Sequence, residues 1–67
     1  MSPKRLSTVI RQLRKERGLT QAEIAKAAKV TKEYITMLER GKRKNPSLPI
    51  LRRIARALGV PVAELLQ

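Results

Sequence analysis

The sequence contains no cysteine, no histidine and no aspartate. Disulfide bonds and thiolate metal sites are therefore excluded. General acid–base catalysis would depend on five glutamates, one tyrosine and hydroxyl groups, which is a poor set for a hydrolase or a metal enzyme. We expect no enzyme activity, no metal site and no cofactor.

Long apolar runs are also absent. No segment approaches the ~20 apolar residues that cross a bilayer. Ser7, Thr8 and Arg11 interrupt the start of the chain, so it lacks the apolar core of about 7–15 residues that a secretion signal needs. We expect a soluble cytoplasmic protein without a membrane segment.

Positive charge is in excess. Lysine and arginine number 16 against five acidic residues, which gives a net charge of +11. Such a field favours polyanions, either a nucleic acid or an anionic membrane surface. The length of 67 residues and the hydrophobic content of 42% predict one small globular domain over residues 1–67, without room for a large internal active site.

Apolar residues recur at helical spacing, and strand-like alternation is absent. Caps and stops predict an all-α fold of five short helices. Thr20, Thr31 and Ser47 are expected N-caps, and glycines end the segments. The first helix is expected to begin at Pro3, after a Ser2 cap, and to stop at Gly18. The second follows the Thr20 cap and ends before Lys29, and the third covers about 31–40. The fourth follows the Ser47 cap and stops at Gly59, and the fifth covers 62–66.

The segment from Thr20 to Gly41 predicts a helix-turn-helix, because two helices of about eight residues are joined by a very short turn. A small residue, Ala25, is placed where the two helices would cross. On the next helix one arc carries the core residues Tyr34, Ile35 and Leu38. The opposite arc of about 140° carries groups that can contact base edges in a major groove, namely Lys32, Glu33, Thr36, Met37 and Arg40.

Several motifs, taken together, resemble the lambdoid phage repressors and the Cro- and Xre-type regulators. They are Leu19-Thr20-Gln21-Ala22-Glu23-Ile24-Ala25, Val30-Thr31, Ile35-Thr36, Leu38-Glu39-Arg40-Gly41 and Ile54-Ala55-Arg56-Ala57-Leu58-Gly59-Val60. The resemblance covers almost the whole chain. It implies a lambda-repressor-like domain in a bacterial or phage protein that binds a palindromic operator as a homodimer and regulates transcription, with repression as the expected outcome.

The resemblance also implies roles for residues on and near the expected helix at about 31–40, which would be the recognition helix and is called the reading helix below. Lys32 and Glu33 occupy the first two base-reading positions, and Thr36 and Met37 lie one turn later. On the major-groove code, Lys32 would donate to guanine and Glu33 would accept from the cytosine N4 amino group. The alternative is a solvated face on which Glu33 only stabilises the N-terminus of its helix. Gln21 resembles a glutamine that contacts a backbone phosphate and braces the first base-reading side chain.

Phosphate contacts are expected around the loop that follows the reading helix. Four cations fall within five residues there, which suits a phosphate clamp. The backbone N–H groups at the start of the next helix can add contacts. The expected phosphate-binding residues, beside Gln21, are Arg40, Lys42, Arg43, Lys44, Asn45 and Ser47.

Two further sites follow from the resemblance. Arg14 and Glu39 match an ion pair that bridges the first and third helices. Near the C-terminus, an apolar surface matches the place where relatives pair on DNA, and it consists of Val60, Pro61, Val62 and Leu66.

Two positions depart from the family pattern. Lys29 stands where a glycine is usual, so a positive φ there would cost roughly 1 kcal/mol. Pro61 replaces a Ser or Thr cap and removes the capping box of the last helix.

Four functions fit these residues. A sequence-specific regulator comes first, and the DNA-binding antitoxin of a toxin–antitoxin pair, with a toxin as protein partner, is the alternative. A sequence-blind binder of nucleic acid or membrane surfaces would show salt dependence without base preference. The fourth is a scaffold whose helix-turn-helix contacts protein.

Overall fold

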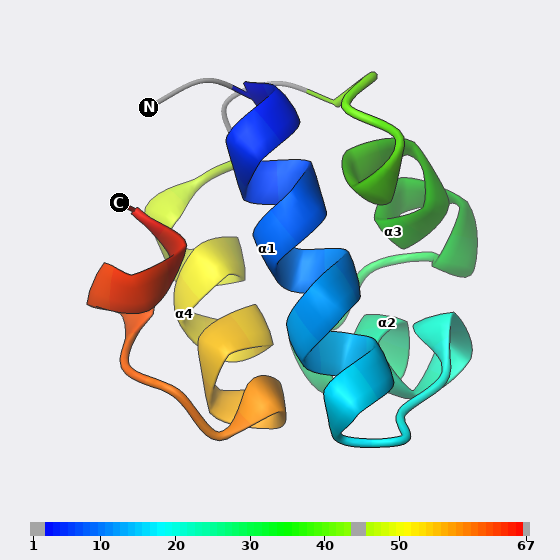
Figure 1. Cartoon of the computed structure of the whole chain (residues 1–67). Coiled ribbons are helices and arrows are strands. Elements are labelled where there is room, and N and C mark those ends of the chain that lie inside the picture. Colours follow the sequence, from blue (N-terminus) through cyan, green and yellow to red (C-terminus); the bar gives the residue numbers. More distant parts are fainter. Residues whose placement is uncertain (1–2, 44–45, 67) are drawn as a thin grey trace.

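The computed structural model describes residues 3–43 and 46–66, which form four α-helices and one short 3-10 helix (Figure 1). In chain order they are α1 (Pro3–Glu16), α2 (Gln21–Ala28), α3 (Lys32–Glu39), α4 (Leu48–Leu58) and the 3-10 helix η1 (Val62–Leu65). The all-α prediction is confirmed for these residues. No helix in the two described stretches is long and apolar enough to cross a membrane.

The expected fifth α-helix is wrong, because residues 62–65 form only one 3-10 turn. Pro61 precedes this turn and gives it no side-chain cap. Its backbone hydrogen bonds span three residues each, from the Glu64 N–H to the Pro61 carbonyl and from the Leu66 N–H to the Ala63 carbonyl. So short a segment completes no α-helical ladder. The expected Ser2 cap lies outside the described residues.

The other caps form as the sequence predicts. Thr20, Thr31 and Ser47 each accept a hydrogen bond from a backbone N–H three residues further on. At α2 the Glu23 carboxylate also accepts from the Thr20 N–H at 2.8 Å, which completes a capping box. These side chains satisfy N–H groups that have no partner within the helix, and so they fix where α2, α3 and α4 begin.

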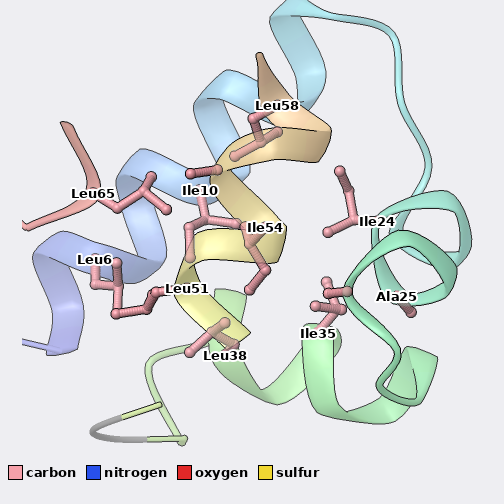
Figure 2. Close-up of a cluster of buried hydrophobic side chains, with 12 residues drawn as sticks. Leu6, Ile10, Ile24, Ala25, Ile35, Leu38, Leu51, Ile54, Leu58 and Leu65 are labelled. Carbon is pink, nitrogen blue, oxygen red and sulfur yellow. The ribbon is translucent and has the colours of Figure 1, made fainter. Parts of the chain in front are cut away.

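One hydrophobic core joins all the elements (Figure 2). α2 packs against both α3 and α4, while α1 packs against α3 and η1. Burial of each large apolar side chain contributes roughly 1.5–3 kcal/mol, so this cluster holds α3 firmly on the body of the domain. The largest side chains with no appreciable exposure are Ile10, Ile24, Ile35, Leu38, Ile54, Leu58 and Leu65.

The turn between α2 and α3 contains the strained residue that the sequence indicates. Lys29 has φ +61° and ψ +41°, in the left-handed region, and its N–H bonds to carbonyls of the preceding turn. It is the one residue other than glycine with a positive φ in the described chain. The left-handed turn allows α3 to start after only Val30 and Thr31.

Replacing Lys29 with glycine is therefore expected to raise the free energy of unfolding by about 1 kcal/mol. The strain relieved is roughly 1–2 kcal/mol, and the greater freedom of glycine in the unfolded chain offsets part of it. Urea denaturation of the two proteins measures the difference. Ala27→Gly is the control, because Ala27 is exposed within α2, where glycine should destabilise by about 1 kcal/mol. Equal losses in both variants would mean that Lys29 is not strained.

Candidate nucleic-acid interface

The outer face of α3 carries the expected reading residues. Ile35 and Leu38 are buried at 0% and 1% exposure and fix the rotation of the helix. The opposite face is consequently turned to solvent: Lys32, Glu33 and Met37 are exposed, and Thr36 is half-buried. These four side chains line a single shallow hollow in the surface. One helix thus presents a cation, a carboxylate, a hydroxyl and an apolar tip together.

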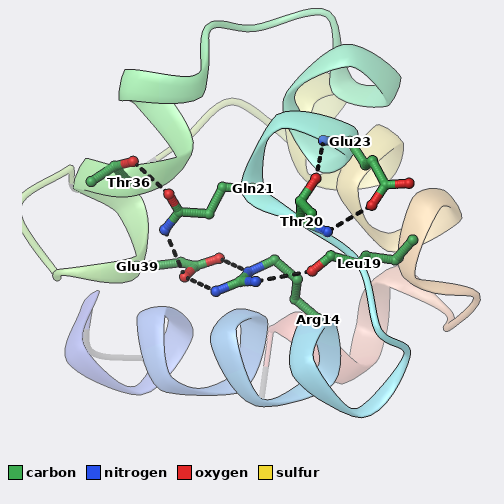
Figure 3. Close-up of polar contacts among 7 residues, drawn as sticks. All are labelled: Arg14, Leu19, Thr20, Gln21, Glu23, Thr36 and Glu39. Atoms are coloured by element: carbon green, nitrogen blue, oxygen red, sulfur yellow. Dashed lines mark hydrogen bonds and ion pairs between the residues drawn. The ribbon is translucent and has the colours of Figure 1, made fainter.

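Beneath this face the predicted ion pair between α1 and α3 is present (Figure 3). Arg14 donates from Nε to Glu39 Oε2 at 2.6 Å and from Nη2 to Glu39 Oε1 at 3.0 Å. Its Nη1 donates to the Leu19 carbonyl at 2.9 Å. The side chain of Glu39 is only 3% exposed and that of Arg14 14%. A bidentate pair of this kind fixes the direction as well as the position of α3.

The same ion pair raises the pKa of Arg14. The hydrogen bond to Glu39 is the main cause and its negative charge adds to the effect, while burial acts in the opposite direction. The guanidinium is therefore charged at every pH at which the protein would be handled. Glu39 in turn always faces a cation within the fold.

Gln21 and Thr36 extend this pair to the surface (Figure 3). Gln21 Nε2 donates to Glu39 Oε1 at 3.1 Å. The Thr36 hydroxyl donates to Gln21 Oε1 at 2.8 Å. A continuous set of hydrogen bonds therefore runs from α1, through the first residue of α2, to the exposed face of α3. The family resemblance implies that Gln21 braces the first base-reading side chain, which would be Lys32. In the structure Gln21 bonds instead to Thr36, one turn later, and to Glu39.

The basic loop is described only in part. Arg40 and Lys42 are exposed. The Arg43 guanidinium lies over the Tyr34 ring, 4.9 Å from its centroid, a distance at which cation and ring attract each other. Lys44 and Asn45 lie outside the described residues. The Ser47 hydroxyl accepts the N–H of Ile50 at 3.4 Å as a helix cap. Pro49 has no N–H and Leu51 donates to the Ser47 carbonyl, so Leu48 is the residue of the first turn of α4 whose N–H these bonds leave available.

The expected dimer surface is partly apolar and accessible. Leu66 is 43% exposed, Pro61 is exposed, and Val60 and Val62 are half-buried. The two valines pack against the core from outside. The surface is small and lies on the segment around η1.

Three contacts in the structure could not be predicted from the sequence. Arg53 on α4 donates from Nε to the Ala28 carbonyl at 2.8 Å, which ties the end of α2 to α4. Arg43 stacks on Tyr34, and Gln21 bonds to Thr36. The bonds of Arg53 and Gln21 join different helices, and Arg43 reaches back from the loop after α3 to a residue of that helix, so no helical spacing signals these contacts. For Tyr34, the helical pattern predicts only that it packs against the core.

Two short helices at a tight turn, with an outward-facing second helix, define a helix-turn-helix domain. Comparison with known proteins agrees. A family model described as Helix-turn-helix matches residues 10–65. An uncharacterized HTH-type transcriptional regulator from Methanothermobacter thermautotrophicus is 54% identical over 54 residues, which is 81% of this chain and 77% of the relative.

Two further matches extend the comparison. The immunity repressor protein of Bacillus phage phi105 is 44% identical over 54 residues, 81% of this chain and 37% of the repressor. The structure of SinR, described as the master regulator for biofilm formation in complex with DNA, matches with a TM-score of 0.86 and 37% identity, over 92% of this chain and 98% of that chain.

This chain belongs to the helix-turn-helix family of Xre- and Cro-type transcriptional regulators. The resemblance seen in its motifs is confirmed. The chain spans much of the archaeal relative but little more than a third of the phage repressor.

Removing either member of the Arg14–Glu39 pair should destabilise the domain. Glu39→Ala leaves a partly buried guanidinium without its carboxylate, and we expect a loss of roughly 2–4 kcal/mol. Arg14→Ala should cost a similar amount, and the double variant clearly less than the sum, because the second change removes the orphaned charge.

Urea denaturation of the four proteins measures this coupling. Arg17→Ala and Glu16→Ala form a matched control cycle, because these two groups lie 3.8 Å apart on the exposed surface, where an ion pair is worth about 0–1 kcal/mol. Additive losses at Arg14 and Glu39 would contradict the coupling.

Proposed function

We propose that this domain binds double-stranded DNA sequence-specifically as a transcriptional regulator, with α3 in the major groove. The observation that carries the proposal is the composition of the α3 face. Lys32 can donate to guanine, Glu33 can accept from a cytosine amino group, and Met37 can contact a thymine methyl group. A helix face that only contacts water has no need of a fixed direction. The direction of this face is fixed by a buried ion pair and by the core on the opposite side of α3.

The charge distribution supports the same function. Arg40, Lys42 and Arg43 directly follow α3 in the chain, where they would meet the phosphates that flank the groove. We propose that they bind the backbone together with Lys44, Asn45, the start of α4 at Ser47, and Gln21. Stacking on Tyr34 limits the rotamers of Arg43, so this cation loses less entropy on binding.

We further propose that two copies bind one operator with inverted half-sites. The accessible apolar surface at Val60, Pro61, Val62 and Leu66 supplies the contact between them. Because it is far smaller than the ~800 Å² per partner of a stable interface, the pairing is expected on DNA rather than in dilute solution. The regulator and repressor names of the relatives favour this reading over an antitoxin. The protein would act in the cytoplasm, where the genome lies.

Selection of bound duplexes from a random pool tests the function. We expect two inverted half-sites with centres about one helical turn apart. Sedimentation should show a monomer without DNA and two chains on each selected duplex. Leu66→Lys should reduce cooperativity between half-sites but leave the preferred bases unchanged. A pool without base preference would refute specific binding, and one chain per palindromic duplex would refute pairing.

The salt dependence of binding tests the phosphate contacts. Changing Arg40, Lys42 and Arg43 to glutamine should weaken binding to all duplexes alike. The slope of log K against log salt is negative, and its magnitude should decrease by up to about three, because each lost phosphate contact removes nearly one unit.

The control removes three other exposed cations, Lys15, Arg17 and Arg56. They lie near the C-terminal ends of α1 and α4, at the bottom of Figure 1, whereas the loop after α3 is at the top. This variant has the same net charge but should keep most of the slope. Equal changes in both variants would mean that only net charge matters.

A further inference from the structure

The hydroxyl of Thr36 is already engaged before any DNA arrives. Thr36 lies on the reading face between Lys32, Glu33 and Met37, and it is half-buried. Its Oγ1 lies 2.8 Å from Gln21 Oε1. The direction of this hydrogen bond decides what Thr36 can recognise, because a hydroxyl has one proton to donate and two lone pairs to accept with.

The chemistry of Glu39 fixes that direction. A carboxylate only accepts hydrogen bonds, and Glu39 is held beside the Arg14 guanidinium. The group of Gln21 that faces Glu39 at 3.1 Å must therefore be the Nε2 amide. The reverse orientation would bring two acceptor oxygens together in a low-exposure site. Gln21 Oε1 consequently points to Thr36. Because this oxygen only accepts hydrogen bonds, the Thr36 hydroxyl must donate its proton to it.

We propose that Thr36 contacts the DNA only as a hydrogen-bond acceptor and so selects an exocyclic amino group, the N6 of adenine or the N4 of cytosine. Gln21 is the positioning residue that sets this polarity. A threonine with a free proton could pair with either kind of base edge. Here the proton is used inside the protein, so the lone pairs and the methyl group are what remain for the groove.

The same arrangement disfavours the other base edges. Guanine O6 and N7 and thymine O4 are acceptors, and they would face the lone pairs of Thr36 Oγ1. Within the hollow, Lys32 supplies a hydrogen-bond donor and Thr36 an acceptor. Lys32 would therefore contact an acceptor on one base, and Thr36 an amino group on another. This inference rests on the proposed function, since it assigns a base class to a face that must first enter the groove.

Selection from a random pool with variants at Thr36 is the first test. Wild type and Thr36→Ser should both prefer adenine or cytosine at one position of each half-site, because serine keeps the hydroxyl. Thr36→Val keeps the shape and loses the hydroxyl, so its preference at that position should fall roughly three- to tenfold. A Thr36→Val preference equal to that of wild type would overturn the proposal.

Duplexes that lack one amino group identify the contact directly. The selected adenine is replaced by purine, or the selected cytosine by 2-pyrimidinone, each of which lacks the exocyclic amino group. Wild type should bind the altered duplex roughly three- to tenfold more weakly, whereas Thr36→Val should bind both duplexes alike. The arm that shows the loss identifies adenine or cytosine. An equal loss for both proteins at every contacted position would contradict the role of Thr36.

Gln21→Met tests the positioning role. Methionine has a similar length but accepts no comparable hydrogen bond, so the Thr36 proton becomes available to the groove. Bases with acceptor edges should then be tolerated at the same position, and the ratio between amino and keto bases should approach one. A ratio as sharp as that of wild type would refute the role of Gln21. If wild type itself selects no sequence, the proposed function fails instead.

Discussion

The buried carboxylate of Glu39 is the constraint on which the reading face depends. It is 3% exposed, and a charge in that position is costly unless hydrogen bonds surround it. Arg14 supplies two of those bonds and Gln21 a third. Three helices therefore converge on one side chain, and the direction of α3 follows from the need to satisfy it.

Such a pair does not need to add stability to be retained. Well-packed apolar residues in place of a buried ion pair often leave stability unchanged or raise it. An apolar replacement at Arg14 and Glu39 could therefore preserve the core around Ile35 and Leu38. It would nonetheless remove the acceptor that orients Gln21. The pair is better understood as a device for direction than as a source of free energy.

Much of this arrangement could be predicted from local sequence. Periodicity located α1 to α4, since buried positions such as Ile24 and Leu58 follow the helical repeat, and the caps at Thr20 and Thr31 are local signals. The ion pair required the family resemblance, because Arg14 and Glu39 lie 25 positions apart. The 3-10 form of η1, the Arg53 bond to α2 and the Gln21–Thr36 bond depend on tertiary geometry, which no single segment encodes.

The hydrogen-bond chain through Gln21 has a consequence for transplanting the recognition helix. The residues that a duplex could touch on α3 can be copied to another helix-turn-helix scaffold without their support. On the proposed reading, Thr36 would then carry a different proton arrangement, because its partner belongs to α2 and the partner's orientation belongs to α1. On this proposal the smallest portable unit of specificity is an assembly of three helices, and a change at Gln21 alone would alter what Thr36 can recognise.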